Sequence, residues 1–174
     1  MRRATNIIMP VIVLIGILAL LLTSASGCSG KLTPSTTVYY QIGQHAETSR
    51  QILTVVSTNR TNRYAVAGLS SILYSWVDAP PTTFFIIVEV AVTNVGQGSL
   101  GVSRNDFTIK DSEGREYFSV AYKGLDAYPS KKLSSGQTAW GYIAFLVPDI
   151  ATGLELSCVL QGSQPVLGVW TLPY

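Results

Sequence analysis

The segment FFIIVEVAVTN, residues 84–94, carries the strongest strand pattern in the chain and decides its fold class. From residue 88 onward, valine occupies every second position. That pattern is typical of a strand that buries one face and exposes the other. The expected inner side chains are Val88, Val90 and Val92, and the expected outer ones are Glu89, Ala91 and Thr93.

Shorter runs of the same kind lie on both sides of this segment, separated by Gly, Pro, Asn and Asp. No helical periodicity is visible after residue 38, and residues 111–114 (DSEG) have the composition of a tight turn. We therefore predict an all-β fold, an immunoglobulin-like antiparallel β-sandwich of about eight strands. The expected strands are residues 52–57, 84–94, 100–103, 106–110, a strand at Tyr117, and residues 137–147, 154–160 and 167–172.

The beginning of the chain has the layout of an export signal. Arg2 and Arg3 give a basic start, residues 7–22 form an apolar run, and small residues lead up to Cys28. The run is shorter than the roughly 20 residues of a membrane-spanning helix, which favours cleavage over a permanent span. The expected organisation is a signal segment over residues 1–27, a tether over residues 28–38 and the sandwich domain over residues 39–174.

The residues before the cysteine, Ala25-Ser26-Gly27-Cys28, resemble the lipobox of prokaryotic lipoproteins. The resemblance implies that Cys28 receives a diacylglyceryl thioether and that the signal is cut just before it. The protein would then be held on the cell membrane, outside the cytoplasm. Ala25 stands where leucine is usual, so two alternatives stay open. An ordinary signal peptidase could release a secreted protein, or the segment could remain as an uncleaved anchor.

Charge and cysteine usage narrow the class of protein further. The chain has 12 basic and 10 acidic side chains, and Arg2 and Arg3 would leave with the signal. The remaining charges balance, which argues against a nucleic-acid partner, because nucleic acid is bound by clustered Lys and Arg.

Cys158 lies in phase with leucines, and we interpret it as a buried apolar side chain. If Cys28 carried no lipid, the two cysteines could pair in an oxidising compartment.

No residue pattern identifies a reaction. His45 is the only histidine and lies in a polar segment, so we interpret it as a solvated side chain rather than a general base. One histidine and one apolar cysteine cannot supply the ligands of a zinc site. The acidic residues between Asp106 and Glu116 lack the spacing of a calcium loop and suit hairpin turns. We therefore expect no catalytic residues, no metal and no cofactor.

A set of spaced residues runs through the predicted sandwich: VEVAVTNVG at residues 88–96, LGV at 100–102, DFTIKD at 106–111, then Gly114, Tyr117, Leu133, Gly136, Gly141, Phe145, Val147 and Pro148. Together they resemble a widespread family of Ig-like domains of unknown function in bacterial and archaeal lipoproteins, related in fold to a small mycobacterial secreted immunogenic protein. The match spans roughly residues 40–174. The resemblance implies the fold and an envelope location, and it brings no catalytic or binding residues with it.

Two groups of aromatic residues are candidates for a binding surface. The first lies in the apolar segment at residues 65–81, which contains Tyr74 and Trp76 and is longer than a hairpin connection requires. The second is Trp140 and Tyr142, which point opposite to the apolar side of their predicted strand. Exposed aromatic patches mark recognition surfaces, whereas packed ones belong to a core. The sequence leaves both interpretations open.

The expected function is that of a membrane-tethered, extracytoplasmic, non-catalytic module that binds or organises components of the cell envelope. Lipid on Cys28 would provide the membrane contact, and an envelope or extracellular protein or glycan would be the partner. Two alternatives remain, an envelope hydrolase with an unrecognised site and a purely structural spacer. A pocket of converging polar groups would favour the hydrolase, and a surface aromatic patch would favour binding.

Overall fold

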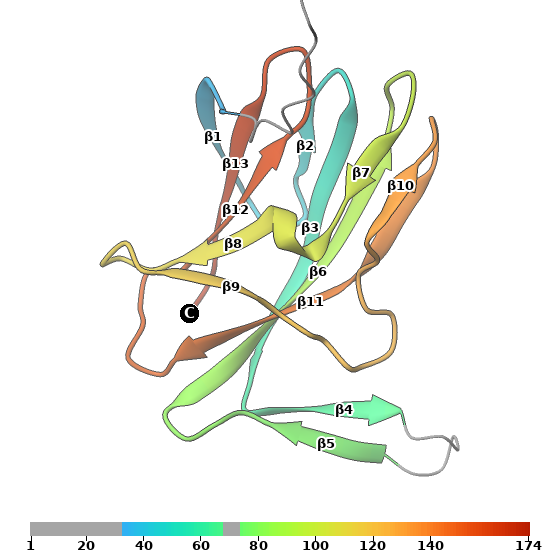
Figure 1. Cartoon of the computed structure of the whole chain (residues 1–174). Coiled ribbons are helices and arrows are strands. Elements are labelled where there is room, and N and C mark those ends of the chain that lie inside the picture. The colour runs from blue at the N-terminus through green and yellow to red at the C-terminus, as the bar shows by residue number, and fades with distance from the viewer. Residues whose placement is uncertain (1–32, 68–73) are drawn as a thin grey trace, which may run out of the picture. The chain divides into compact units, whose positions relative to one another are not determined.

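Figure 1 shows the computed structural model, which describes residues 33–67 and 74–174. The strands in this part are β1 (Thr36–Tyr40), β2 (His45–Glu47), β3 (Gln51–Thr61), β4 (Arg63–Ala67), β5 (Tyr74–Asp78), β6 (Thr83–Asn94), β7 (Leu100–Val102), β8 (Phe107–Lys110), β9 (Glu116–Val120), β10 (Lys131–Leu133), β11 (Thr138–Pro148), β12 (Glu155–Leu160) and β13 (Val166–Thr171), with a 3-10 helix, η1, at Arg104–Asp106. Within these residues, no helix is long and apolar enough to cross a membrane. The predicted signal segment and Cys28 lie outside the described residues.

Nine of the strands form one continuous ladder in the order β1-β13-β12-β8-β9-β11-β6-β3-β2. β9 divides this ladder into two sheets, because its first residues pair with β8 while Ser119 and Val120 pair with β11. The inner faces of the two sheets share one core, which contains Val90 from β6, Leu156 from β12 and Trp170 from β13. The predicted all-β sandwich is confirmed, with more strands than the expected eight.

β6 is the strand that residues 84–94 predict, and it lies between β3 and β11 in one sheet. Val88 and Val90 are fully buried in the core, as the alternation indicates. The first half of β6 is different, because Phe85 and Ile87 are buried on the outer side of the sheet as well. A second apolar cluster covers this part of the outer face. Burial on both faces therefore explains why the FFII run does not alternate.

The predicted tether at residues 28–38 is wrong at its end, because β1 already begins at Thr36. β1 adds in parallel to the edge of β13, with Thr36 opposite Val166 and Tyr40 opposite Trp170. The rings of Tyr40 and Trp170 stack with their centroids 5.3 Å apart. Local Ser, Thr and Pro content is typical of a linker, but the free edge of β13 provides the backbone partners that turn the segment into a strand.

The predicted turn after β8 is present and is built around a buried carboxylate. Gly114 has a φ of 83°, in the left-handed region that glycine adopts without strain. Asp111 accepts hydrogen bonds from the backbone of Glu113 and Arg115, the Arg115 side chain and the Tyr117 hydroxyl. Burial alone would raise the pKa of Asp111, but these hydrogen bonds outweigh it and lower the pKa to about 2. This acidic residue therefore closes a turn.

Candidate binding surface

The apolar segment between β3 and β6 contributes to a hairpin, β4–β5, that packs on the outer face of the sheet. Figure 1 shows the hairpin between the end of β3 and the start of β6. Tyr64 from β4 meets Phe85 edge-to-face, with ring centroids 5.0 Å apart, and lies 4.9 Å from the ring of Tyr122. Val66 and Val77 pack against the same cluster. The interpretation as packed core therefore holds for the sheet-facing side of this segment.

Trp76 lies on the other side of the hairpin. It pairs with Ala65 across the two strands, and 54% of its surface is exposed. The guanidinium carbon of Arg63 lies 4.8 Å from the centroid of the Trp76 ring, a cation–π arrangement. Tyr74 begins β5, but its side chain lies outside what the structure describes. The hairpin thus buries Tyr64 and presents Trp76 to solvent.

A β-bulge in β3 decides which side chains reach the outer face of the sheet. The register shifts between Val55, which is opposite Val90, and Ser57, which is opposite Glu89. Val55 is fully buried in the core. Side chains alternate along a strand, so without the bulge Ser57 would also point to the core. The extra residue, Val56, turns Ser57 to the outer face beside Glu89.

The outer face also has an open part, which we call the platform. Directly opposite residues in antiparallel strands share a face, so the register of β2, β3, β6 and β11 places its residues in three rows. The rows are Glu47, Ile52, Thr93 and Thr138; His45, Thr54, Ala91 and Trp140; and Ser57, Glu89 and Tyr142. All of these residues are exposed or half-buried, and none is Lys or Arg.

Two hydrogen bonds to one carboxylate fix the indole of Trp140 on the platform. Its Nε1 donates to Oε1 of Glu89 at 2.9 Å, and the hydroxyl of Ser57 donates to Oε2 of Glu89 at 2.7 Å. Glu89 belongs to the neighbouring strand and lies one row away, so this hydrogen bond turns the indole from β11 toward β6. Because 43% of Trp140 remains exposed, the fixed ring still offers a surface to a ligand.

Tyr142 connects the platform to the hairpin through a series of aromatic rings. The centroids of Trp140 and Tyr142 are 5.5 Å apart, with the rings inclined at 67°. Tyr142 in turn lies 5.9 Å from Tyr122, which contacts Tyr64 of the hairpin. Burial raises the pKa of the Tyr122 hydroxyl, so the ring is uncharged. These contacts place the ring of Tyr142 between the rings of Trp140 and Tyr122.

The loop that carries Tyr122 is attached to β11 at a glycine. The backbone N–H of Tyr142 donates to the carbonyl of Asp126, and the N–H of Tyr128 donates to the carbonyl of Tyr142. A Cβ atom on Gly141 would lie 2.5 Å from that Asp126 carbonyl oxygen and 2.8 Å from the Cα of Tyr128. Only glycine allows this close approach, and the approach in turn positions the ring of Tyr122 beside the platform.

The remaining polar groups of the platform surround the two rings. Nδ1 of His45 and Oγ1 of Thr54 are 2.7 Å apart, and the hydroxyls of Thr93 and Thr138 are 2.8 Å apart. Hydroxyls and imidazole both donate and accept hydrogen bonds, whereas carboxylates only accept. His45 is exposed, as its polar sequence context indicates. The platform can therefore stack on an apolar ligand face while it hydrogen-bonds to polar groups at the edge of that face.

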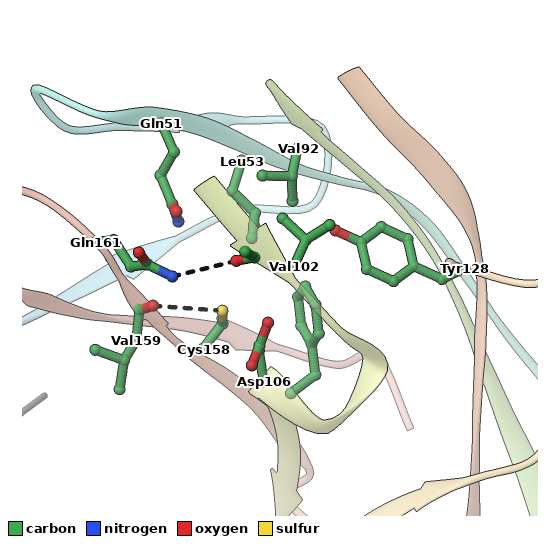
Figure 2. A pocket seen from close by; sticks show the side chains of 11 residues that line it. Gln51, Leu53, Val92, Val102, Asp106, Tyr128, Cys158, Val159 and Gln161 are labelled. Atoms are coloured by element: carbon green, nitrogen blue, oxygen red, sulfur yellow. Dashed lines mark hydrogen bonds between the residues drawn. The ribbon is translucent and has the colours of Figure 1, made fainter. Parts of the chain in front are cut away.

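Figure 2 shows a small pocket between the sheets, lined among others by Gln51, Asp106, Tyr128 and Cys158. Its free volume, about 10 Å³, has room for one water molecule. The buried hydroxyl of Tyr128 has no hydrogen-bond partner among the described residues. Burial raises the pKa of both the Tyr128 hydroxyl and the Cys158 thiol, so both stay protonated. Cys158 is buried as predicted, and the pocket is too small for an organic ligand.

The structure brings together two of the four aromatic residues proposed from the sequence. Trp140 and Tyr142 are neighbours on the platform. Trp76 lies on the solvent side of the hairpin, and the side chain of Tyr74 lies outside the described residues, as does Cys28. The pair on β11 is therefore the aromatic group whose two side chains the structure describes as neighbours.

Sequence reasoning missed the polar partners of these rings, Glu89 and Ser57. Glu89 carries a usable signal, because it is the one charged residue within the strand at residues 84–94 and the alternation assigns it to the outer face. Ser57 carries none, since the bulge that turns it outward depends on pairing with β6. The packing of Tyr122 against Tyr142 joins a loop to a strand and has no local pattern.

Comparison with known proteins places the chain among uncharacterised domains. The family model described as "Domain of unknown function (DUF4352)" matches residues 40–164. No curated protein matches the chain in sequence.

Solved structures with the same fold include a "putative lipoprotein (ycdA)" of Bacillus subtilis, 14% identical with a TM-score of 0.53, which is matched over 72% of this chain and only 37% of that one. An uncharacterized β-sandwich protein of Clostridium difficile is 13% identical, with a TM-score of 0.52 over 82% of this chain and 99% of its own. The secreted protein MPT63 of Mycobacterium tuberculosis is 12% identical, with a TM-score of 0.50 over 79% of this chain and 99% of its own. At these identities the likeness shows the β-sandwich fold alone.

Proposed function

The chain belongs to the DUF4352 family, and we propose that it is a membrane-tethered, extracytoplasmic module that binds an envelope component through the platform. The observation that carries this proposal is the indole of Trp140, which is fixed by Glu89 and yet 43% exposed. A ring held in place loses little conformational freedom on binding, and aromatic side chains are enriched among the residues that dominate binding energy.

The hydrogen bonds of Glu89 indicate a supporting role for this carboxylate in the binding surface. Both carboxylate oxygens accept a hydrogen bond from inside the protein, one from Trp140 and one from Ser57. In this arrangement Glu89 acts as a positioning residue for the indole.

The location rests on the export signal and on the structural neighbours, one of which is a lipoprotein candidate and another a secreted protein. If lipid is attached to Cys28, eight peptide steps lead from the membrane to Thr36 at the start of β1. Fully extended, those steps span at most about 29 Å.

Photo-cross-linking in intact cells tests the binding role. The full chain would carry a photoreactive phenylalanine analogue either at Thr54, in the row of Trp140, or at Phe118, which is 67% exposed on the other sheet. We expect adducts from position 54 that disappear when Trp140→Ala is added, and few adducts from position 118. Equal adducts from both positions, or adducts that do not depend on Trp140, would contradict the proposal.

The mass of the native protein tests the anchor. The mature chain should begin at Cys28 and exceed the polypeptide mass by a diacylglyceryl group, with or without N-acylation. Cys28→Ser should send the protein to the soluble fraction or leave it uncleaved. An unmodified Cys28, or a mature chain that begins elsewhere, would show that the protein is not lipid-anchored at this residue.

A further inference from the structure

We infer that the ligand of the platform is an uncharged glycan, one hexopyranose ring of which lies on the exposed face of the Trp140 indole. This inference rests on the proposed binding function and adds the chemical class of the partner. It follows from the chemistry of the platform residues, which combine one fixed apolar ring with a surrounding set of hydroxyl, imidazole and carboxylate groups.

The first step concerns the indole itself. A hexopyranose has a ring face made of C–H groups, and such a face packs on the π-surface of an aromatic side chain. Trp140 lies opposite Ala91, which has the smallest side chain in the three rows and leaves room for the indole to turn toward Glu89. Tyr142 stands at 67° to the indole and forms a wall beside the exposed face. One sugar ring can thus stack on Trp140 and contact Tyr142 with its edge.

The second step concerns the edge of that sugar ring, which consists of hydroxyl groups that both donate and accept. A carboxylate has about four lone-pair sites, and Glu89 uses one on each oxygen for Trp140 and Ser57. The remaining sites can accept from sugar hydroxyls. His45 and Thr54, which follow Ala91 in the row of Trp140, offer a further donor and acceptor pair.

Charge excludes the acidic alternatives. Glu89 and Glu47 are the charged residues of the platform, and neither Lys nor Arg belongs to it. A phosphate-bearing polymer or an acidic polysaccharide would meet carboxylates without a cation to pair with, and like charges brought together oppose binding. The ligand that fits this set of groups carries no negative charge.

The distribution of apolar surface decides between a glycan and a protein partner. Protein interfaces of standard size bury about 800 Å² on each side around an apolar, desolvated centre. Here two rings, Trp140 and Tyr142, lie in adjacent rows of the platform and are bordered by hydroxyls and carboxylates. The apolar surface of two rings suits one or two sugar units, whose hydroxyls can replace the water bound to the surrounding hydroxyls and carboxylates.

The test is a titration of the full-length protein in detergent micelles with cellohexaose and, separately, N-acetylchitohexaose. The indole N–H signal of Trp140, assigned by its loss in Trp140→Phe, reports on the platform by NMR. We expect a saturable shift of this signal with at least one hexaose, insensitive to added sodium chloride. Trp140→Ala lacks the reporter signal, so its binding is measured by isothermal titration calorimetry and should be about tenfold or more weaker than that of the wild type. Glu89→Gln, which keeps an acceptor but no charge, should weaken it less.

Trp76→Ala is the matched control, because Trp76 is exposed to a similar degree on another surface, and it should bind as the wild type does. A Trp140 signal that neither hexaose moves, or equal binding by Trp140→Ala and wild-type protein, would overturn the glycan assignment. If cross-linking from position 54 still yields a Trp140-dependent adduct in that case, the binding function stands and the partner is not a glycan. If neither hexaose binds and position 54 yields no Trp140-dependent adduct, the platform is not a binding surface.

Discussion

The packing of the β4–β5 hairpin gives the sharpest stability prediction. Tyr64→Ala removes a side chain that is only 6% exposed, together with its contacts to the rings of Phe85 and Tyr122. Truncation of a buried aromatic residue costs about 3–5 kcal/mol. The cluster around Tyr64 is small and can relax, so we expect the lower end, a loss of about 3 kcal/mol in the free energy of unfolding.

Two control variants measure the contribution of the Tyr64 hydroxyl and the contribution of the solvent-facing side of the hairpin. The hydroxyl of Tyr64 donates to the carbonyl of Ala121 at 3.4 Å and accepts from the N–H of Lys123 at 3.3 Å, both long hydrogen bonds. Tyr64→Phe should therefore cost about 1 kcal/mol or less. Trp76→Ala, on the solvent side of the same hairpin, loses mainly its contact with Arg63 and should also cost about 1 kcal/mol or less.

Urea unfolding of the full chain, followed by circular dichroism, measures these differences. With an m-value of about 1–3 kcal/mol/M, a loss of about 3 kcal/mol lowers the midpoint by about 1–3 M. A Tyr64→Ala variant as stable as the wild type would show that the hairpin does not pack on the sheet. Equal losses for Tyr64→Ala and Trp76→Ala would show that the two faces of the hairpin are assigned wrongly.

Three further predictions concern the turn, the loop contact and the pocket. The folded protein lowers the pKa of Asp111 to about 2, so the carboxylate stabilises the fold above about pH 4 and this contribution fades as the pH falls toward 2. Asp111→Asn should therefore be less stable than wild type at pH 7 by thermal melting, with a gap that narrows over that window; a constant gap would contradict this role of the carboxylate. Gly141→Ala should lower the free energy of unfolding by about 2–3 kcal/mol in calorimetry, because its Cβ would lie 2.5 Å from the Asp126 carbonyl oxygen. Gly101→Ala is the control: its Cβ would meet nothing within 4 Å, so its free energy of unfolding should fall less. Tyr128→Phe should change stability by less than about 1 kcal/mol in urea, since its hydroxyl has no partner among the described residues; a loss above about 2 kcal/mol would mean that this hydroxyl binds a firmly held molecule in the pocket.

The sandwich could be predicted because its central strands obey local rules. The alternation of valines determines the inner face of β6, and Asp111 with Gly114 determines the turn between β8 and β9. Both patterns depend on neighbours in sequence. The same alternation, applied to β11, correctly assigns Trp140 and Tyr142 to the outer face of the sheet.

Other elements depend on long-range pairing, and the sequence alone could not supply them. β1 exists because the edge of β13 is free, although its own composition is that of a linker. The sequence marks residues 65–81 only as one apolar segment, because Trp76 and Val77 are both apolar although they face opposite sides of the hairpin. The link between Trp140, Glu89 and Ser57 joins three strands through a bulge, and a bulge is a property of the pair of strands rather than of either one.

Oxidative footprinting of the three tryptophans tests the central claim most directly, because they lie on the platform, on the hairpin and in the core. Hydroxyl radicals would label the full-length protein once in its native envelope and once after purification. We predict that Trp140, 43% exposed in the protein alone, is protected in the envelope, that the more exposed Trp76 is labelled equally in both, and that the fully buried Trp170 is labelled in neither. Labelling of Trp140 that is the same in both preparations would contradict the proposal that the platform is the binding surface.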